Sequence, residues 1–544
     1  MQVIIEATPD EVLGSSLLIP HPRPSPSSKE YASNTADYDR KDGADLQHHS
    51  LAAKVSTIKE APSKIVAPTP IYASWRNSLL TDSFVTDSPL PHSNPGALDH
   101  QKSPAYKRVF DVAGLPVEII CQIFEKFVEG DPRQNDKYLP RHLVSRRCPS
   151  DPIRMGQICS RWRTIALSRP ELWSKIYIHN PNPSQIRPVR ICLERSGNRL
   201  LDIGISYDGE DHKFDNRSAS RILGSLHSRL EHWRDIKFQL PFQFLRTLLA
   251  MLQFDQRPIR LECASIGFMG SIGYPYEPKF DPYIHAIWNF FHRSPKLTQV
   301  DWRGRGVDNF PRHAPFKQLT HVRTNFTLSI DEVLAFLASV PRIQELSIES
   351  IRRKPQTELY LDDPPLFLQH LRALSVHSLS IRTGSLYSSL ICPALETLKI
   401  DHNSLTYQPN QDLSEVIQFL QRSDCQLKAL SIKDPHLSDD DLERLLPSPA
   451  LCSLTSLSIR KNVIRDPFVR VLMKQLEDGT HVLLPRLERL LLNSCDTTDG
   501  LLASLITSRW YIGALPGALR WALVTPKKGF GFNDKAFFNT HELR

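Results

Sequence analysis

The sequence contains no long hydrophobic run. No uninterrupted apolar segment in its 544 residues approaches the roughly 20 residues that a transmembrane helix needs. The first residues, MQVIIEATPDEVLG, carry acidic side chains where a signal peptide would carry basic ones. We therefore expect a soluble protein with no membrane partner, located in the cytoplasm, the nucleus or both.

Paired cysteines and metal-ligand spacings are also lacking. The nine cysteines are scattered, odd in number and without a C-x-x-C pair, which argues against a disulfide framework or a zinc ribbon and fits a reducing compartment. The twenty histidines form no H-x-x-x-H arrangement. Asp439, Asp440 and Asp441 follow Ser438 where a helix is predicted to begin, so they suit a helix cap better than a metal ion. We expect no metal and no cofactor.

Signatures of catalysis are missing as well. The chain has neither a G-x-S-x-G nucleophile elbow nor a Walker sequence, and its G-x-G fragments lack the third glycine of a phosphate loop. We predict that the protein is not an enzyme and assign no catalytic residue. A site assembled from distant loops would escape a search for local motifs, and so an enzyme stays open as a distant alternative.

A large excess of charge is absent too. Lysine and arginine outnumber aspartate and glutamate by 67 to 59, a net charge of +8 that is mild over this length and does not indicate a nucleic-acid partner. The run KGFGF at Lys528–Phe532 matches the start of an RNA-recognition signature. However, Asn533 and Lys535 replace the apolar and aromatic residues that should follow, and only twelve residues remain after Phe532. We expect no nucleic-acid partner.

Of what is present, residues 1–105 are rich in Pro, Ser, Asp and His, and their apolar residues are too dispersed to form a core. This composition predicts a disordered N-terminal arm. Ser25, Ser88 and Ser103 each precede a proline and are candidates for phosphorylation, although such dipeptides also arise from composition alone.

The stretch Leu115–Ile178 has helical periodicity in two pieces. Apolar residues at helical spacing predict one amphipathic helix over LPVEIICQIFEKFVEG and a second one that begins at Pro152 and continues through Ala166. A third short helix is predicted at Ser168–Trp173, and the proline-containing insert Asp131–Ser150 between the first two helices is predicted to be a loop. Helices this short cannot bury all their apolar surface against one another, so part of it should face another surface.

A phrase of the form L-x-x-L-x-I/L recurs after residue 297. Its starts differ by 22, 24, 28, 24, 32, 27 and 33 residues, a period typical of leucine-rich repeats. In each phrase the first, fourth and sixth residues should be buried in a shared core beneath a short parallel strand, with a helix completing the unit. The phrases begin at Leu297, Leu319, Ile343, Leu371, Leu395, Leu427, Leu454 and Leu487. Segments that begin at Leu200, Leu230 and Ile259 match the phrase less well and are candidates for degenerate first units.

The helical stretch resembles an F-box, most closely the F-box-like form common in large fungal families. The resemblance covers about sixty residues and rests on L-P-x-E-I-x-x-x-I-F, then I-C-x-x-W-R-x-I-A, then P-x-L-W. The matching residues are Leu115, Pro116, Glu118, Ile119, Ile123, Phe124, Ile158, Cys159, Trp162, Arg163, Ile165, Ala166, Pro170, Leu172 and Trp173.

The resemblance implies a substrate receptor that binds a Skp-family adaptor, and through it a cullin-RING ubiquitin ligase, while its repeats capture an unidentified target protein. The candidate adaptor contacts are Leu115, Pro116, Ile119, Ile120, Ile123, Ile158 and Trp162. For residues such as Ile123 and Trp162, packing within the helical module is about as good an explanation, whereas Leu115 and Pro116, at the open N-terminal edge, are the better contact candidates. A leucine-rich-repeat scaffold that keeps an F-box-like fold without joining a ligase is the second hypothesis.

The predicted fold class is therefore α+β or α/β. We expect a disordered arm at 1–105, a three-helix F-box-like domain at 110–178, a leucine-rich-repeat-like α/β solenoid at 190–525, and a C-terminal tail or cap at 526–544. Polar residues between the buried leucines are expected to line the concave face of the solenoid: Lys399, Asp401, Lys433, Arg460 and Lys461.

Overall fold

The computed structural model describes most of the chain after residue 113. The described residues are 114–129, 152–207, 214–252, 256–269, 281–304, 310–311, 314–351, 364–378, 383–402, 413–477, 480–509 and 519–540. They all belong to one compact unit, Asp111–Arg544. The expected disordered arm and the expected loop at Asp131–Ser150 lie outside the described residues.

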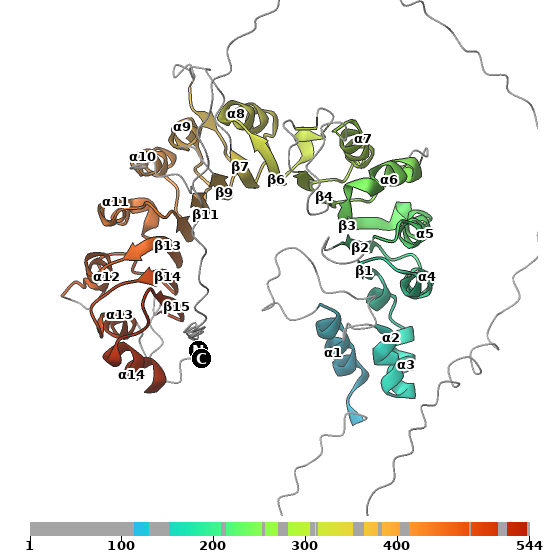
Figure 1. The fold of residues 1–544 in the computed structure, drawn as a ribbon, viewed down its shortest axis with the longest axis horizontal. Helices are drawn as coiled ribbons and strands as arrows, with labels where there is room; N and C mark the ends of the chain where they lie inside the picture. Colours follow the sequence, from blue (N-terminus) through green and yellow to red (C-terminus); the bar gives the residue numbers. More distant parts are fainter. Residues whose placement is uncertain are drawn as a thin grey trace, which may run out of the picture. The chain divides into compact units, whose positions relative to one another are not determined.

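Helices and strands alternate along this unit (Figure 1). The helices are α1 Val117–Glu129, α2 Pro152–Ile158, α3 Ser160–Leu167, α4 Pro183–Ser196, α5 Asn216–His227, α6 Leu245–Leu252, α7 Asp281–His292, α8 Ile330–Ser339, α9 Gly384–Ser388, α10 Ser414–Ser423, α11 Asp439–Leu445, α12 Asp466–Met473, α13 Leu501–Arg509 and α14 Phe532–Thr540. Short 3-10 helices include η2 Pro170–Trp173 and η3 Leu230–His232.

The strands form one parallel sheet of 13 strands whose order follows the chain. Its members are β1 Lys175–His179, β2 Leu201–Ser206, β3 Trp233–Pro241, β4 Cys263–Met269, β5 Gln299–Gly304, β6 His321–Leu328, β7 Glu345–Ile351, β9 Ala373–Ser378, β11 Thr397–His402, β12 Ala429–Lys433, β13 Ser456–Ile464, β14 Arg489–Cys495 and β15 Trp521–Pro526. A second, two-stranded sheet pairs β8 Leu366–Phe367 with β10 Leu390–Ile391.

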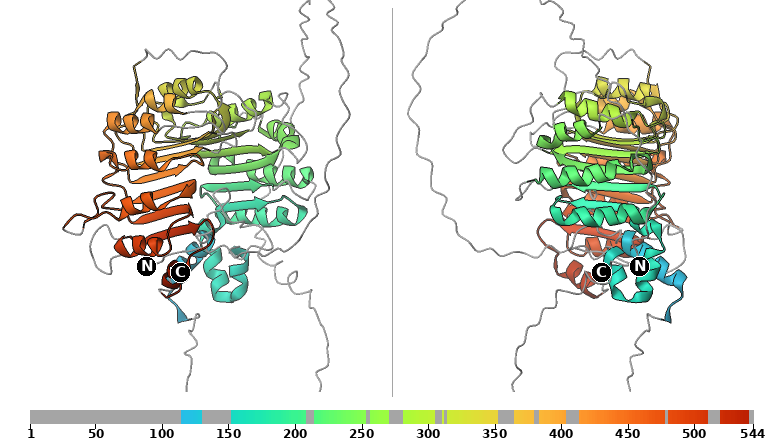
Figure 2. Two further views of the ribbon diagram at one scale, coloured as in Figure 1. Left: turned by 60° about the vertical axis from the view of Figure 1, so that its left-hand side comes forward. Right: turned by 90° about the vertical axis from the view of Figure 1, so that its right-hand side faces the viewer.

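Strands line the inner side of the curved sheet and helices its outer side (Figures 1 and 2). Parallel neighbours cannot be joined by a tight hairpin, so a crossover, usually a helix, must connect them. The consequence is a stack of strand-and-helix units, in agreement with the alternation that the sequence predicts.

The leucine phrase explains the register of the sheet. In β11 to β14, Leu398, Leu430, Leu457 and Leu490 are direct register partners and are all buried. Alternate side chains of a strand point to opposite faces, so the intervening polar residues lie on the inner face. The expected burial of the first, fourth and sixth phrase residues is confirmed at these strands; those residues of the Leu395 phrase are fully buried.

The sheet begins earlier than the repeated phrase. The three segments predicted to be degenerate first units form β2, β3 and β4, and β1 precedes them directly after the N-terminal helices. Two tryptophans occupy equivalent positions just before or at the start of a strand, one before β1 and one in β3. The indole Nε1 of Trp173 donates to Ala166 O at 2.8 Å, and that of Trp233 donates to Leu226 O at 3.0 Å. Each bond satisfies a carbonyl in the last turn of the preceding helix.

The expected second helix is two helices. Cys159 adopts an extended conformation between α2 and α3, and its Sγ accepts a hydrogen bond from the backbone N–H of Trp162. A cysteine sulfur is an uncommon N-cap acceptor, so periodicity alone does not reveal this break. The third helix begins later than predicted, at Pro170, because Ser168 ends α3 and its hydroxyl donates to Ile165 O.

The C-terminal part of the described chain closes the sheet with β15 and α14. Within the KGFGF run Gly529 takes a positive φ of 92°, and the Phe530 ring packs on Phe538 at 4.9 Å between centroids. The predicted helix cap at Ser438 is confirmed, with Asp441 completing a capping box. No described helix has the length and apolarity to cross a bilayer.

Candidate protein-interaction surfaces

Helix α1 has an apolar line on each of two faces. Ile120 and Phe124 are fully buried in the core. Ile119, Ile123 and Phe127 are 39–41% exposed and follow one another at intervals of four residues. Side chains four residues apart stand above one another on a helix, so these three form a continuous exposed line. Helix α1 thus buries one apolar stripe and leaves a second one open.

Two contacts hold α1 against α3. The Phe124 and Trp162 rings meet edge to face with centroids 4.9 Å apart, a favourable arrangement of their quadrupoles. Arg161 reaches back to the start of α1, where its Nη2 donates to Leu115 O at 2.7 Å. These contacts fix the first turn of α1, although part of the Trp162 side chain remains accessible.

The break at Cys159 exposes another apolar side chain. Met155 packs into the core from α2, whereas Ile158, at the end of that helix, is 62% exposed. Leu167, at the end of α3, is 42% exposed. The apolar surface of the helical module therefore continues beyond α1.

The last element of the module, η2, is joined to the sheet. Leu172 and Trp173 are buried, and the Arg195 guanidinium of α4 lies 4.5 Å from the centre of a Trp173 ring. Glu171 forms an ion pair with Arg199, just beyond the end of α4. Only Ser174 separates η2 from β1, so the helical module passes into the sheet without a linker.

The candidate contacts predicted from the sequence have different surroundings. Pro116, Ile119, Ile123 and Ile158 are exposed, Leu115 and Trp162 are partly buried, and Ile120 has no exposed surface. Three further apolar residues are exposed here but had no predicted contact role: Val117, Phe127 and Leu167. Phe127 follows Ile123 by one turn, and that spacing was the signal that could have identified it.

The chemistry of this surface is apolar. Among the described residues there is no group of three or more His, Cys, Asp or Glu side chains placed to hold a metal ion. Six of the eleven large apolar side chains that are exposed in the described part of the chain lie in α1 to α3. Such a concentration is typical of a surface that another protein covers.

Comparison with protein families identifies this region. Residues 112–179 match the family described as F-box-like. The chain thus contains an F-box-like domain, made of α1, α2, α3, η2 and the first strand of the sheet. No curated protein matches the sequence significantly.

Among solved structures, one match is a protein from Bacteroides fragilis. It is 15% identical, the alignment covers 53% of this chain and 73% of that one, and the TM-score is 0.32. A similarity this low carries no argument about function.

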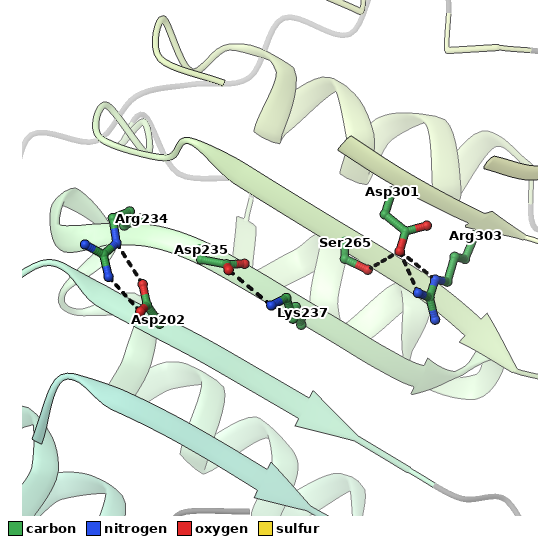
Figure 3. Close-up of polar contacts among 7 residues, drawn as sticks. All are labelled: Asp202, Arg234, Asp235, Lys237, Ser265, Asp301 and Arg303. Atoms are coloured by element: carbon green, nitrogen blue, oxygen red, sulfur yellow. Dashed lines mark hydrogen bonds and ion pairs between the residues drawn. The ribbon is translucent and has the colours of Figure 1, made fainter. Parts of the chain in front are cut away.

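The inner face of the sheet is a second candidate surface, and its first strands carry ion pairs (Figure 3). The Arg234 guanidinium on β3 makes two hydrogen bonds, of 2.9 and 2.7 Å, to the Asp202 carboxylate on β2. On β5, Arg303 donates to Asp301 Oδ2 at 2.6 Å, and Ser265 on β4 donates to the same oxygen at 3.0 Å. These pairings neutralise most of the charge locally.

Asp235 on β3 is paired as well, with Lys237 Nζ at 3.2 Å. Burial disfavours the charged carboxylate, and despite the nearby Lys237 the pKa of Asp235 lies above its ordinary value.

The inner face of β9 to β13 has a different charge balance. On β11 the Asp401 carboxylate meets His377 Nδ1 at 3.3 Å and Lys433 Nζ at 3.1 Å. Burial opposes ionisation of Asp401, but the hydrogen bonds from His377 and Lys433 outweigh it and lower its pKa to about 2. Arg460 on β13 is exposed.

One residue expected on this face is not there. Lys461 is buried and pairs with Asp439 at the start of α11. Lys461 directly follows Arg460, and neighbouring side chains of a strand point to opposite faces, so Lys461 lies on the core side of β13.

Proposed function

We propose that this protein is a non-catalytic substrate receptor of a Skp-cullin-F-box type ubiquitin ligase. The observation that carries the proposal is the exposed apolar line Ile119, Ile123 and Phe127 on the first helix of the F-box-like domain. An exposed apolar helix face costs solubility unless a partner covers it, and a Skp-family adaptor is the partner that F-box domains bind.

The proposed adaptor surface comprises the exposed or partly exposed candidates. These are Leu115, Pro116, Ile119, Ile123, Phe127, Ile158 and Trp162. Ile120 supports the surface from beneath, because its side chain is completely buried in the core.

The remainder of the sheet is, on this proposal, a leucine-rich-repeat-like solenoid that presents a target protein. Parallel strands in chain order, an outer layer of helices and buried leucines in register support this assignment. The domains would then be the F-box-like module at 110–178, the solenoid at 190–525 and a cap at 526–544, with β1 as the strand at which module and solenoid meet.

Affinity capture with a purified Skp-family adaptor tests the proposal. We expect the intact protein to retain the adaptor, and Ile119→Asp with Ile123→Asp to weaken retention by about tenfold or more, because a charge would enter a desolvated interface centre. Val482→Asp is the matched control, since Val482 is also an exposed apolar residue, 47% accessible, but lies outside the helical module. Failure of the folded, intact protein to retain the adaptor would overturn the proposal.

A scaffold that keeps the F-box-like fold without joining a ligase is the second candidate. The burial of Trp173 against α4 favours it, because the module then contributes to the stability of the sheet whether or not an adaptor binds. The two candidates separate cleanly in cells with the proteasome inhibited. Recovery of adaptor and cullin with the protein supports the receptor, and their absence supports the scaffold.

A further inference from the structure

Two cations lie side by side on the inner face of the sheet. In the register of β11, β12 and β13, Asp401 pairs with Lys433, and Lys433 pairs with Arg460. Register partners in neighbouring strands place their side chains on the same face at close distance, so Lys433 and Arg460 are direct neighbours. Like charges in this position repel each other.

Among the described inward positions of these strands there is one carboxylate, Asp401, and it is already occupied. Asp401 interacts with Lys433 and with His377 on its other side. Within the described residues, the exposed Arg460 makes neither an ion pair nor a side-chain hydrogen bond. A positive charge at Arg460 thus remains available to an anion from outside.

Hydroxyl groups border the two cations. Ser375, Ser431 and Ser458 occupy the central inward position of β9, β12 and β13. All three are partly exposed, and their hydroxyls make no hydrogen bond with other described residues. These short side chains add donors for an oxyanion and leave the backbone of the strands accessible to an extended chain.

Further positive charge continues along the same face. Lys399 is the register partner of Ser375 and Ser431, and the exposed Arg489 begins β14 beside Ser456. We call Lys399, Lys433, Arg460 and Arg489 the cationic strip. Across β9 to β14 the inward positions hold four cations and one carboxylate, Asp401, whereas the ion pairs of β2 to β5 are balanced.

We propose that the cationic strip binds an extended acidic segment of a protein, with one carboxylate or phosphate seated between Lys433 and Arg460. This inference rests on the proposed function, because it names the class of target that a receptor would capture. From β9 to β14 there are four strand spacings of about 4.8 Å, or roughly 19 Å, which an extended segment of about six residues spans.

A protein segment fits this surface better than a single-stranded nucleic acid does. Sequence-tolerant binding of single strands relies on aromatic side chains that stack on the bases. The inward positions of β9 to β13 hold no Phe, Tyr or Trp. The anions of a partner are therefore bound by charge and hydroxyl groups, without a stacking platform.

Fluorescence polarisation with the purified full-length protein tests the inference. The probes are four labelled twelve-residue peptides that share a Gly/Ser framework: one with six Asp/Glu residues, one with three phosphoserines, one with Asn/Gln in their place and one with six Lys. A single-stranded RNA of twelve nucleotides is the fifth probe. No adaptor is present, so a failure here is independent of a failure of adaptor capture.

The decisive variant is Arg460→Glu. The new carboxylate lies beside Lys433 and can pair with its ammonium group. We expect acidic-peptide binding to fall about tenfold or more, because one attraction is lost and one repulsion gained. The melting temperature should not fall, since the repulsion between two cations has been removed. Arg221→Glu on the outer face of α5 changes the net charge equally and should alter binding less than about twofold.

Tight binding of the carboxylate and phosphate peptides alike assigns the site to Asp/Glu-rich segments, and about tenfold preference for phosphoserine assigns it to phosphorylated ones. Both results support the inference. Equal binding of the Asn/Gln peptide, equal loss in the Arg221→Glu variant, or no binding of either acidic peptide overturns it. Binding of the RNA alone, reduced by Arg460→Glu, overturns it in favour of nucleic acid.

Discussion

The first and the later strands of the sheet share one backbone arrangement but differ in how they treat charge. In β2 to β5, Asp202, Asp235 and Asp301 each meet a cation from the same or an adjacent strand. In β11 to β14, cations outnumber carboxylates and Arg460 has no partner among the described residues. Since both regions belong to one parallel sheet whose strand order follows the chain, the difference arises from the side chains. The charges on the first strands are paired within the sheet, whereas the later strands keep a positive charge that is unpaired among the described residues.

The same two regions also satisfy helix ends differently. Near the start, Trp173 and Trp233 donate indole N–H groups to the last turn of the preceding helix. Further along, Arg422 donates to carbonyls at the end of α9, and Arg509 does so at the end of α12. A guanidinium supplies several donors and a positive charge where the helix dipole is negative. The later region therefore depends on the partly buried Arg422 and the buried Arg509 for its stability.

The largest expected effect follows from removing one of those cations. Arg509 donates to Leu472 O at 2.6 Å, Leu483 O at 2.8 Å and Leu484 O at 3.1 Å, and it is 4% exposed. Arg509→Met should lower the free energy of unfolding by roughly 3–5 kcal/mol, because three carbonyls lose their donor. Urea denaturation measures this. Arg470→Met, at a side chain 63% exposed, is the control, with an expected change under about 0.5 kcal/mol.

Removing a cation from the inner face should affect the first strands more than the later ones. Arg303→Met leaves the partly buried Asp301 carboxylate without its guanidinium and should cost about 2 kcal/mol. Arg460→Met breaks no ion pair or side-chain hydrogen bond with the described residues and should change stability by less than about 0.5 kcal/mol. Equal losses in the two variants, measured by denaturant titration, would contradict the contrast between the two regions.

The smallest expected effect, about 1 kcal/mol, concerns pH. The folded protein lowers the pKa of Asp401 to about 2, so its ionisation stabilises the fold above the unfolded value near 3.8, and this contribution is lost as pH falls from about 4 to 2. Asp401→Asn should therefore destabilise the protein at pH 6 by about 1 kcal/mol, a figure that allows for solvent screening, and by progressively less as the pH falls toward 2.

The pKa of Asp235 is shifted in the opposite direction, so Asp235 serves as the control. Its pKa is raised by burial, so ionisation of the folded protein at neutral pH opposes stability, and protonation at lower pH relieves this penalty. Asp235→Asn should be neutral or stabilising at pH 6. Thermal unfolding across pH 2–7 compares the two variants, and parallel curves would refute the assignment.

The later units were predictable from the sequence because the leucines that recur at regular positions are also the residues that are buried in the core. The first units were harder, since β2 to β4 use different apolar residues at the same register positions. Gly204 shows why: a Cβ there would lie 2.3 Å from the Tyr177 ring, which crosses over this strand. The position is set by a neighbour distant in sequence. Lys461 was misplaced because it was assigned to the same face as Arg460, whereas adjacent residues of a strand point to opposite faces.

The helical surface was predictable only in part. Both apolar lines of α1 have helical spacing, so the sequence could not decide that Ile120 and Phe124 are buried while Ile119 and Ile123 are exposed. That decision depends on packing against Trp162 and the start of the sheet. The break at Cys159 depends on a sulfur acceptor that standard capping preferences do not include.

Strand β1 belongs to the F-box-like domain and to the sheet at once, with a single residue between it and η2. A hinge at this junction would have to break the contact between the Arg195 guanidinium and the Trp173 ring and the backbone bond from Asp202 to Ser174 O. The separation along the sheet between the F-box-like helices and any later strand is thus counted in whole strands. Adding or deleting one strand-and-helix unit during evolution would change this separation by about 4.8 Å, the spacing between neighbouring strands.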